Sequence, residues 1–271
     1  MLRQIKEATE FIFNIIGNQK PEVGIILGTG LGQLASEIEI QHSISYQDIP
    51  NFPISTVESH AGRLLFGTLS GKQVVAMQGR FHFYEGYTMQ QVVFPVRVMK
   101  YLGITNLMVS NACGSLIPEI KAGDLMVIND HINLLPGNPL IGKNDDDLGP
   151  RFPDMSNAYT KALVKKGVAL AETLNIPIHT GVYVAVCGPN LETAAEYKYL
   201  KIIGGSVVGM STVPEVIAAA QMGLPVFAIS VITDEGWHEH LQPITLSDVI
   251  RIASATEPKM TQLLKELIAL L

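Results

Sequence analysis

Cysteine, positive charge and long apolar runs are all scarce in this sequence, and each scarcity excludes a class of protein. The two cysteines, Cys113 and Cys187, cannot make a disulfide framework, so the chain suits a reducing compartment. Its 19 lysines and arginines are outnumbered by 25 aspartates and glutamates, and the net charge of −6 argues against general nucleic-acid binding. An anionic small substrate stays open, because a few local positive groups can outweigh a diffuse negative total.

Membrane insertion is excluded in the same way. No apolar run approaches the roughly 20 residues that a helix needs to span a bilayer. The apolar stretch 11–16 follows Lys6, Glu7 and Glu10, which is typical of an amphipathic helix and not of a signal peptide. We therefore expect a cytoplasmic protein with neither a membrane nor a nucleic acid as partner. Hydrophobic residues make up 47% of the chain, which allows a large core.

Short apolar runs alternate with helix-compatible stretches along the chain, without an internal repeat or a linker. The runs that predict buried strands are 23–27, 64–69, 74–77, 106–110, 125–128, 182–186, 207–208 and 226–232. The stretches that predict helices are 2–17, 33–37, 89–102, 158–174, one ending near 203, 213–222 and one beginning near 246. This alternation predicts one α/β domain over residues 1–271, with a mixed central sheet flanked by helices. Ligands are expected outside the carboxyl ends of the strands.

Small and polar residues occupy the turns after these strands. The glycine-rich turn 28–32 presents backbone N–H groups, although it matches neither the dinucleotide fingerprint nor the P-loop. Residues 207–215 predict a buried strand that ends at Gly209 and turns directly into a helix, capped by the hydroxyl of Ser211 or Thr212. Tight packing without a ligand explains each turn alone at least as well. The loop 136–156 is rich in proline and glycine, and loops of such length are usually functional or interfacial.

Arg80, His82 and Tyr84 alternate after a predicted hairpin over 64–79. In an extended chain all three side chains point the same way, which would suit an oxyanion beside a hydroxylated ligand. The plain alternative is an exposed polar strand face. Cys113 is better explained as a small buried core residue than as a nucleophile. Because every such polar segment follows a strand or caps the hairpin, the sequence favours one composite site.

Six of these segments resemble the trimeric, low-molecular-mass purine nucleoside phosphorylases. The matching stretches are 28–32, 60–63, 79–87, 111–114, 188–193 and 209–215, in the family's order and over nearly the whole chain. The resemblance implies phosphorolysis, in which a purine nucleoside and phosphate give free purine and ribose 1-phosphate. Inorganic phosphate is then a co-substrate, and neither a metal nor an organic cofactor is required. It also implies a homotrimer.

The resemblance assigns residues to each part of the substrate, with His82, Glu192 and Asp234 expected to serve catalysis. The phosphate would be bound by Thr29, His60, Arg80, His82, the backbone N–H of Ala112, and Ser211. The ribose would meet Tyr84 and Met210, the purine would meet Glu192 and Asp234, and Phe152 would cover the sugar in a neighbouring subunit's active site. Hydrogen bonds to the leaving base and phosphate beneath the sugar would stabilise the separating charges.

Asp234 departs from the family's pattern, since members specific for 6-oxopurines usually carry asparagine there. An ionised Asp234 only accepts hydrogen bonds and would repel the O6 and N7 acceptors of hypoxanthine. The related methylthioadenosine phosphorylases carry aspartate at this position, whereas an ionised Glu192 suits the N1–H of a 6-oxopurine. We expect one proton shared between the two carboxyls. The predicted substrates are ribo- and deoxyribonucleosides of 6-oxopurines, such as inosine and guanosine, with some tolerance of 6-aminopurines.

A second departure lies near the start of the last helix, where the family commonly places a histidine and this chain has Leu246. His238 or His240 is a candidate to reach the 5′-hydroxyl instead. An apolar Leu246 could admit a 5′-alkylthio group, which keeps a 5′-methylthioadenosine or adenosine phosphorylase open as an alternative. A non-catalytic nucleoside-binding protein would be expected to lose its anion-binding residues, but they are present. A dinucleotide-dependent oxidoreductase is disfavoured by the imperfect glycine fingerprint.

Overall fold

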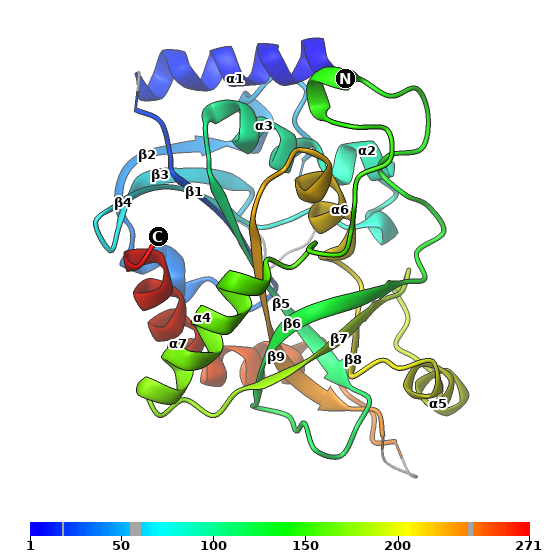
Figure 1. Ribbon diagram of the computed structural model, residues 1–271. Coiled ribbons are helices and arrows are strands. Elements are labelled where there is room, and N and C mark those ends of the chain that lie inside the picture. Colours follow the sequence, from blue (N-terminus) through cyan, green and yellow to red (C-terminus); the bar gives the residue numbers. More distant parts are fainter. Residues whose placement is uncertain (18, 55–60, 238–240) are drawn as a thin grey trace.

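The structure is a computed structural model that describes residues 1–17, 19–54, 61–237 and 241–271. Within these ranges nine strands form one sheet in the order β2–β3–β4–β1–β5–β8–β7–β6–β9 (Figure 1). The strands are β1 (Val23–Leu27), β2 (Glu39–Ser45), β3 (Arg63–Leu69), β4 (Lys72–Gln78), β5 (Asn106–Ser115), β6 (Leu125–Asn133), β7 (His179–Ala185), β8 (Val207–Gly209) and β9 (Val226–Glu235).

Helices lie on both sides of this sheet. The α-helices are α1 (Leu2–Ile16), α2 (Met89–Val92), α3 (Phe94–Leu102), α4 (Lys161–Thr173), α5 (Ala194–Ile202), α6 (Val213–Gln221) and α7 (Leu246–Ala269). Short 3-10 helices are η1 (Gln33–Glu37), η2 (Tyr46–Asp48), η3 (Phe83–Glu85) and η4 (Asp146–Leu148). The predicted α/β fold with a mixed sheet is confirmed, because β1 is parallel to β4 and β5 while β3 is antiparallel to β2 and β4.

The sheet has two parts that differ in shape. Strand β5 pairs with β8 and also with β9, so that β5, β8, β7, β6 and β9 close into a ring. Strands β1, β4, β3 and β2 continue from β5 as an open sheet. Because β4, β1, β5 and β9 are mutually parallel, the segments that follow them meet on one side of the molecule.

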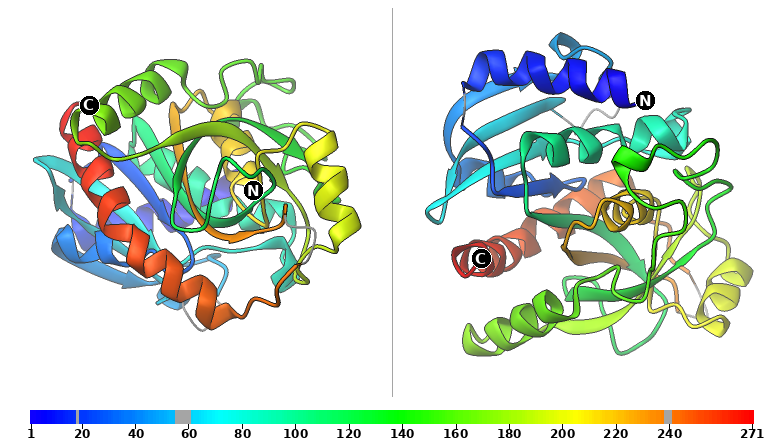
Figure 2. Two further views of the ribbon diagram at one scale, coloured as in Figure 1. Left: turned by 90° about the horizontal axis from the view of Figure 1, so that it is seen from below. Right: turned by 45° about the horizontal axis from the view of Figure 1, so that its top comes forward.

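Two helical layers cover the open sheet and the ring. Helices α1 and α3 lie on one side, and α4 and α7 lie on the other (Figures 1 and 2). Helix α1 buries Ile5, Ala8, Ile12 and Ile16, whose spacing of three and four residues places them on one face. Each buried isoleucine stabilises the fold by about 1.5–3 kcal/mol. Among the described residues, none of the helices combines the length and apolar character needed to cross a bilayer.

Several elements differ from the sequence-based expectations. Strand β2 was not predicted, and its mostly exposed residues leave no apolar pattern to detect. The predicted helix 89–102 is divided at Val93 into α2 and α3. Pro95 lies in the first turn of α3 and has no N–H with which to continue the hydrogen-bond ladder of α2. Strands β5 and β9 run further than predicted, with consequences for the site.

Candidate active site

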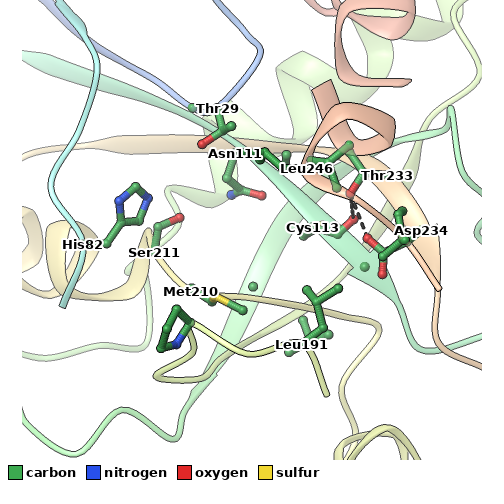
Figure 3. Close-up of a pocket in the computed structure, with 18 of the residues that line it drawn as sticks. Thr29, His82, Asn111, Cys113, Leu191, Met210, Ser211, Thr233, Asp234 and Leu246 are labelled. Atoms are coloured by element: carbon green, nitrogen blue, oxygen red, sulfur yellow. Dashed lines mark hydrogen bonds between the residues drawn. The ribbon is translucent and has the colours of Figure 1, made fainter. Parts of the chain in front are cut away.

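A cavity of about 410 Å³ opens where the ring meets the open sheet (Figure 3). Its walls come from segments that lie far apart in the chain. The lining residues are Gly28, Thr29, Arg80, His82, Tyr84, Asn111, Ala112, Cys113, Gly114, Pro189, Leu191, Glu192, Val208, Gly209, Met210, Ser211, Thr233, Asp234, Ile244, Thr245, Leu246 and Val249. This volume falls in the range of small-molecule sites. The predicted convergence of scattered segments on one pocket is therefore present.

Arg80 forms the most deeply buried charged contact of the cavity wall, with 1% of its surface exposed. Its Nε and Nη2 donate to the carboxylate of Glu215 at 3.0–3.1 Å, and its Nη1 donates to the carbonyl oxygen of Ser110 at 2.6 Å. Glu215 lies in the first turn of α6. Such a fork fixes the plane of the guanidinium.

His82 is held by contacts with a second carboxylate, that of Glu85. Its Nδ1 lies 2.9 Å from Oε1 of Glu85, which also accepts from the backbone N–H of His82 at 2.7 Å. Burial lowers the pKa of His82, and the carboxylate of Glu85 opposes that effect. The chain turns into η3 after His82, so the expected extended alternation of Arg80, His82 and Tyr84 is wrong. The rings of His82 and Tyr84 nevertheless stack at 4.7 Å, and both line the cavity.

The turn between β8 and α6 carries a chain of hydroxyl contacts. Ser211 Oγ lies 3.2 Å from Thr212 Oγ1, which accepts from Asn111 Nδ2 at 3.0 Å. Thr212 is the N-cap residue of α6, with a φ of 70°, but its side chain makes no capping hydrogen bond. The predicted capping by a hydroxyl is therefore wrong. Gly209 leaves room for the hydroxyl of Tyr183, since a Cβ there would lie 2.2 Å from it. That hydroxyl accepts from the N–H of Ser211 at 3.3 Å.

Asn111 also presents an acceptor that lacks a partner. Its Oδ1 is buried and makes no hydrogen bond to the part of the chain that the structure describes. A buried polar atom without a partner costs about 1–3 kcal/mol, and Asn111 lines the cavity. A ligand carrying a hydroxyl proton would satisfy this atom.

Asp234 lies across the cavity from His82 and Ser211 (Figure 3), and Glu192 lines the same cavity. Burial raises the pKa of both carboxyls, and the negative charge of Asp234 raises the pKa of Glu192 further. Thr233 Oγ1 donates to Asp234 Oδ1 at 2.9 Å, which works against the rise. Both carboxyls therefore favour the neutral form more than an exposed carboxyl does.

Several site residues lie on strands and not on the turns that the sequence predicted. Asn111, Ala112 and Cys113 belong to β5, and Thr233 and Asp234 belong to β9. These two strands are paired in parallel, with a register shift between Cys113 and Gly114. Cys113 is buried, and burial raises the pKa of its thiol, which agrees with the core role expected for it.

The first turn of α7 covers the cavity with apolar groups. Leu246 and Val249 line it, together with Ile244 and Thr245 from the segment that leads into the helix. The position of Leu246 within reach of a ligand was anticipated from the sequence. Ile244 and Val249 were not, because nothing in their local pattern separates them from ordinary helix residues.

Most of the predicted site residues lie around this single cavity. Those brought together are Thr29, Arg80, His82, Tyr84, Ala112, Glu192, Met210, Ser211 and Asp234. Phe152 does not reach the cavity of its own chain and is 87% exposed, with Arg151 packed on its ring. His60, His238 and His240 lie outside the described residues. The structure adds Tyr197, which contacts Glu192 and Asp234 from behind and which the sequence did not single out.

Metal binding finds no support in the described ranges. Within them, no group of three or more histidine, cysteine, aspartate or glutamate side chains is placed to hold a metal ion. The cavity instead combines the Arg80–Glu215 ion pair and the His82–Glu85 contact with two further carboxyls.

Comparison with known proteins identifies the family to which this fold and site belong. The model of the phosphorylase superfamily matches residues 22–269, so fold and site define a phosphorylase. Purine nucleoside phosphorylase 1 of Bacillus subtilis is 50% identical, covering 99% of each chain. Isoform 2 of purine nucleoside phosphorylase from Schistosoma mansoni, solved with cytosine and ribose-1-phosphate, superposes with a TM-score of 0.94 at 40% identity, covering 98% of this chain and 96% of that one. The Schistosoma mansoni enzyme solved with inosine superposes with a TM-score of 0.93 at 42% identity, covering 99% of this chain and 96% of that one.

This chain belongs to the purine nucleoside phosphorylase family and is by class a pentosyltransferase. The resemblance inferred from six sequence segments is thereby confirmed over the whole length of the domain.

Proposed function

We propose that this chain catalyses the reversible phosphorolysis of 6-oxopurine nucleosides to free purine and ribose 1-phosphate. The observation that carries the proposal is the division of one cavity into two ends. All five residues that define these ends line the cavity, with His82 and Ser211 on one side and Asp234 on the other (Figure 3). Arg80 is close enough to His82, and Asp234 to Glu192, for its charge to shift the pKa of that neighbour. The cavity volume of about 410 Å³ suits a ligand of this size. The proposed reaction uses phosphate as co-substrate and needs no cofactor.

The phosphate end would act through aligned hydrogen-bond donors. Glu215 holds the guanidinium of Arg80 in one orientation, and Glu85 holds the imidazole of His82. Phosphate bound by these groups with Thr29 and Ser211 would lie beneath the sugar. It would stabilise positive charge on the ribose and then attack the anomeric carbon. The bond to the purine breaks as the bond to phosphate forms, and its electron pair leaves with the base.

The base end would bind the leaving purine. An ionised Glu192 would accept from the N1–H of a 6-oxopurine, and a protonated Asp234 would donate to N7. Burial, which raises the pKa of Asp234, supports this neutral form. An enzyme that superposes on this chain was solved with inosine, a 6-oxopurine nucleoside, which also supports the assignment.

A phosphate-dependent assay with a nucleoside panel tests the proposal. Inosine, guanosine, their deoxy forms and adenosine are incubated with enzyme, with and without phosphate, and the released base is quantified. We expect phosphate-dependent release from inosine and guanosine, and slower release from adenosine. A clear preference for adenosine would contradict the proposed order. Release without phosphate would contradict phosphorolysis.

A second candidate is a 5′-methylthioadenosine phosphorylase, favoured by the apolar Leu246 in the cavity wall. A methylthio group would pack on this side chain and on Val249, where a 5′-hydroxyl finds no polar partner from α7. Adding 5′-methylthioadenosine to the same panel separates the two candidates, because the second predicts that it outranks inosine in kcat/KM.

We propose further that the enzyme is a homotrimer that serves purine salvage in the cytoplasm. Phe152 supports the trimer, since its exposed ring is free to cover the sugar in a neighbouring subunit's active site. The unpaired Cys113 and Cys187 support a reducing compartment. Sedimentation equilibrium gives the oligomeric state. Mixing Phe152→Ala subunits with inactive Glu192→Gln subunits would restore activity only if Phe152 acts across an interface.

A further inference from the structure

Tyr197 lies next to the two carboxyls of the base end, outside the cavity lining. It belongs to α5 and does not line the cavity. Its hydroxyl donates to Asp234 Oδ2 at 3.5 Å, and it lies close enough to Glu192 to lower the pKa of that carboxyl. Glu192 lies two residues before α5 and Asp234 lies near the end of β9, so this phenol connects two parts of the site that are distant in the chain.

The ring of Tyr197 is held tightly in place. It is 6% exposed and packs with Leu116, Val184, Leu200 and Val208. Gly236 makes room for it, because a Cβ at that position would lie 2.2 Å from the ring. A fixed ring fixes the hydroxyl, so that the oxygen stays close to the carboxyls.

A phenol has one proton and can therefore donate to one carboxylate at a time. When it donates to Glu192, Asp234 faces the lone pairs of the phenol oxygen, and a proton on Asp234 becomes favourable. Within the described ranges neither carboxyl has an ion pair with lysine or arginine. The neighbouring charges are those of Glu196 and Glu235, which also disfavour a second negative charge.

The remaining groups around the pair do not disturb this arrangement. Thr233 donates to the other oxygen of Asp234, and Cys113 approaches from β5 as a neutral thiol because burial raises its pKa. The pKa of Tyr197 is also raised by burial and by both carboxyls, so the phenol keeps its proton.

We propose that Tyr197 is a positioning residue whose hydroxyl links Glu192 to Asp234, so that the pair holds a single proton. The pair then offers a purine one acceptor and one donor, which matches the N1–H and N7 of a 6-oxopurine. This inference rests on the proposed function for its substrate, but the link itself is a property of the protein alone.

The substitution Tyr197→Phe tests the link, because it removes the hydroxyl and keeps the buried ring. Tyr199→Phe is the matched control on the same helix, where the side chain is 52% exposed. We expect kcat/KM for inosine to fall about 10- to 100-fold in Tyr197→Phe, the size of a lost hydrogen bond to a charged group. We also expect the acidic limb of its pH profile to move to higher pH, because the lost donor had favoured the ionised carboxylate. Tyr199→Phe should match the wild type in both.

A double-mutant cycle separates the link from a packing effect. In an Asp234→Asn background the second carboxyl is gone, so Tyr197→Phe should lower kcat/KM for inosine by a several-fold smaller factor than it does in the wild type. An equal loss of kcat/KM in both backgrounds would overturn the proposal, and so would an acidic limb of the Tyr197→Phe pH profile that does not move.

Infrared titration of the carboxyl bands provides a readout without substrate, with Glu192→Gln and Asp234→Asn used to assign them. In Tyr197→Phe we expect the carboxyl that accepts from the phenol to titrate at higher pH, and unchanged titration would also overturn the link. If the wild type is inactive on every nucleoside of the panel, the proposed function fails, while the infrared result still decides the role of Tyr197.

Discussion

The two ends of the cavity are built on opposite electrostatic principles. At the phosphate end each polar side chain already has a carboxylate partner, Arg80 with Glu215 and His82 with Glu85. At the base end two carboxyls lie near one phenol, and within the described ranges neither has an ion pair with lysine or arginine. The first end is fixed before any ligand arrives, whereas the second adjusts its protonation. An enzyme that aligns one substrate and discriminates among bases needs both.

The largest expected effect comes from breaking the buried pair at the phosphate end. Arg80→Ala leaves Glu215 as an uncompensated buried carboxylate, so we expect a loss of about 3–5 kcal/mol in the free energy of unfolding. Urea unfolding measures it. Arg3→Ala is the control, because its ion pair is exposed and should change stability by less than about 0.5 kcal/mol. Equal losses in both variants would refute the structural role of the Arg80–Glu215 pair.

The next effect concerns catalysis at the base end. Glu192→Gln removes an acceptor for N1–H and places a donor there, and we expect kcat/KM for inosine to fall about 100- to 1,000-fold. Steady-state kinetics with saturating phosphate measures it. Glu172→Gln on the exposed face of α4 is the control and should leave the kinetics unchanged. A loss below about threefold in Glu192→Gln would remove this carboxyl from the base site.

A smaller effect on selectivity is expected from Asp234→Asn. The amide donates without needing a proton from solution, so the ratio of kcat/KM for inosine to that for adenosine should rise about tenfold. The panel assay gives both values. An unchanged ratio would show that Asp234 does not contact the base.

The smallest effect is a difference in how the two ends respond to pH. The folded pKa of His82 is lowered, so its contribution to stability is lost as pH falls through its unfolded value of about 6.5. The folded pKa of Asp234 is raised, so its contribution is lost as pH rises above about 3.9. As pH rises from 4 to 7, the melting temperature of Asp234→Asn should rise relative to that of the wild type. Parallel curves would contradict the raised pKa.

The segments around the cavity were readable from sequence because each has a local signature. Glycine-rich turns after apolar runs and the alternation of Arg80, His82 and Tyr84 are such signatures, whereas the roles of Glu192 and Asp234 followed from the resemblance to a known family. The local rules failed where pairing decided the outcome. Strand β5 continues through Asn111–Ser115 because β9 and β8 supply partners there, which no local pattern reveals.

The sequence by itself determined the α/β alternation, because apolar periodicity and turn chemistry are local properties, and its short motifs determined the family and many of the residues that line the cavity. Only the tertiary structure decided that Glu215 pairs with Arg80, that the hydroxyl of Thr212 does not cap α6, and that the hydroxyl of Tyr197 reaches Asp234. Each of these contacts joins residues from different elements. Their distances and burial, and hence their charges, follow from the packing of strands that are remote in the chain.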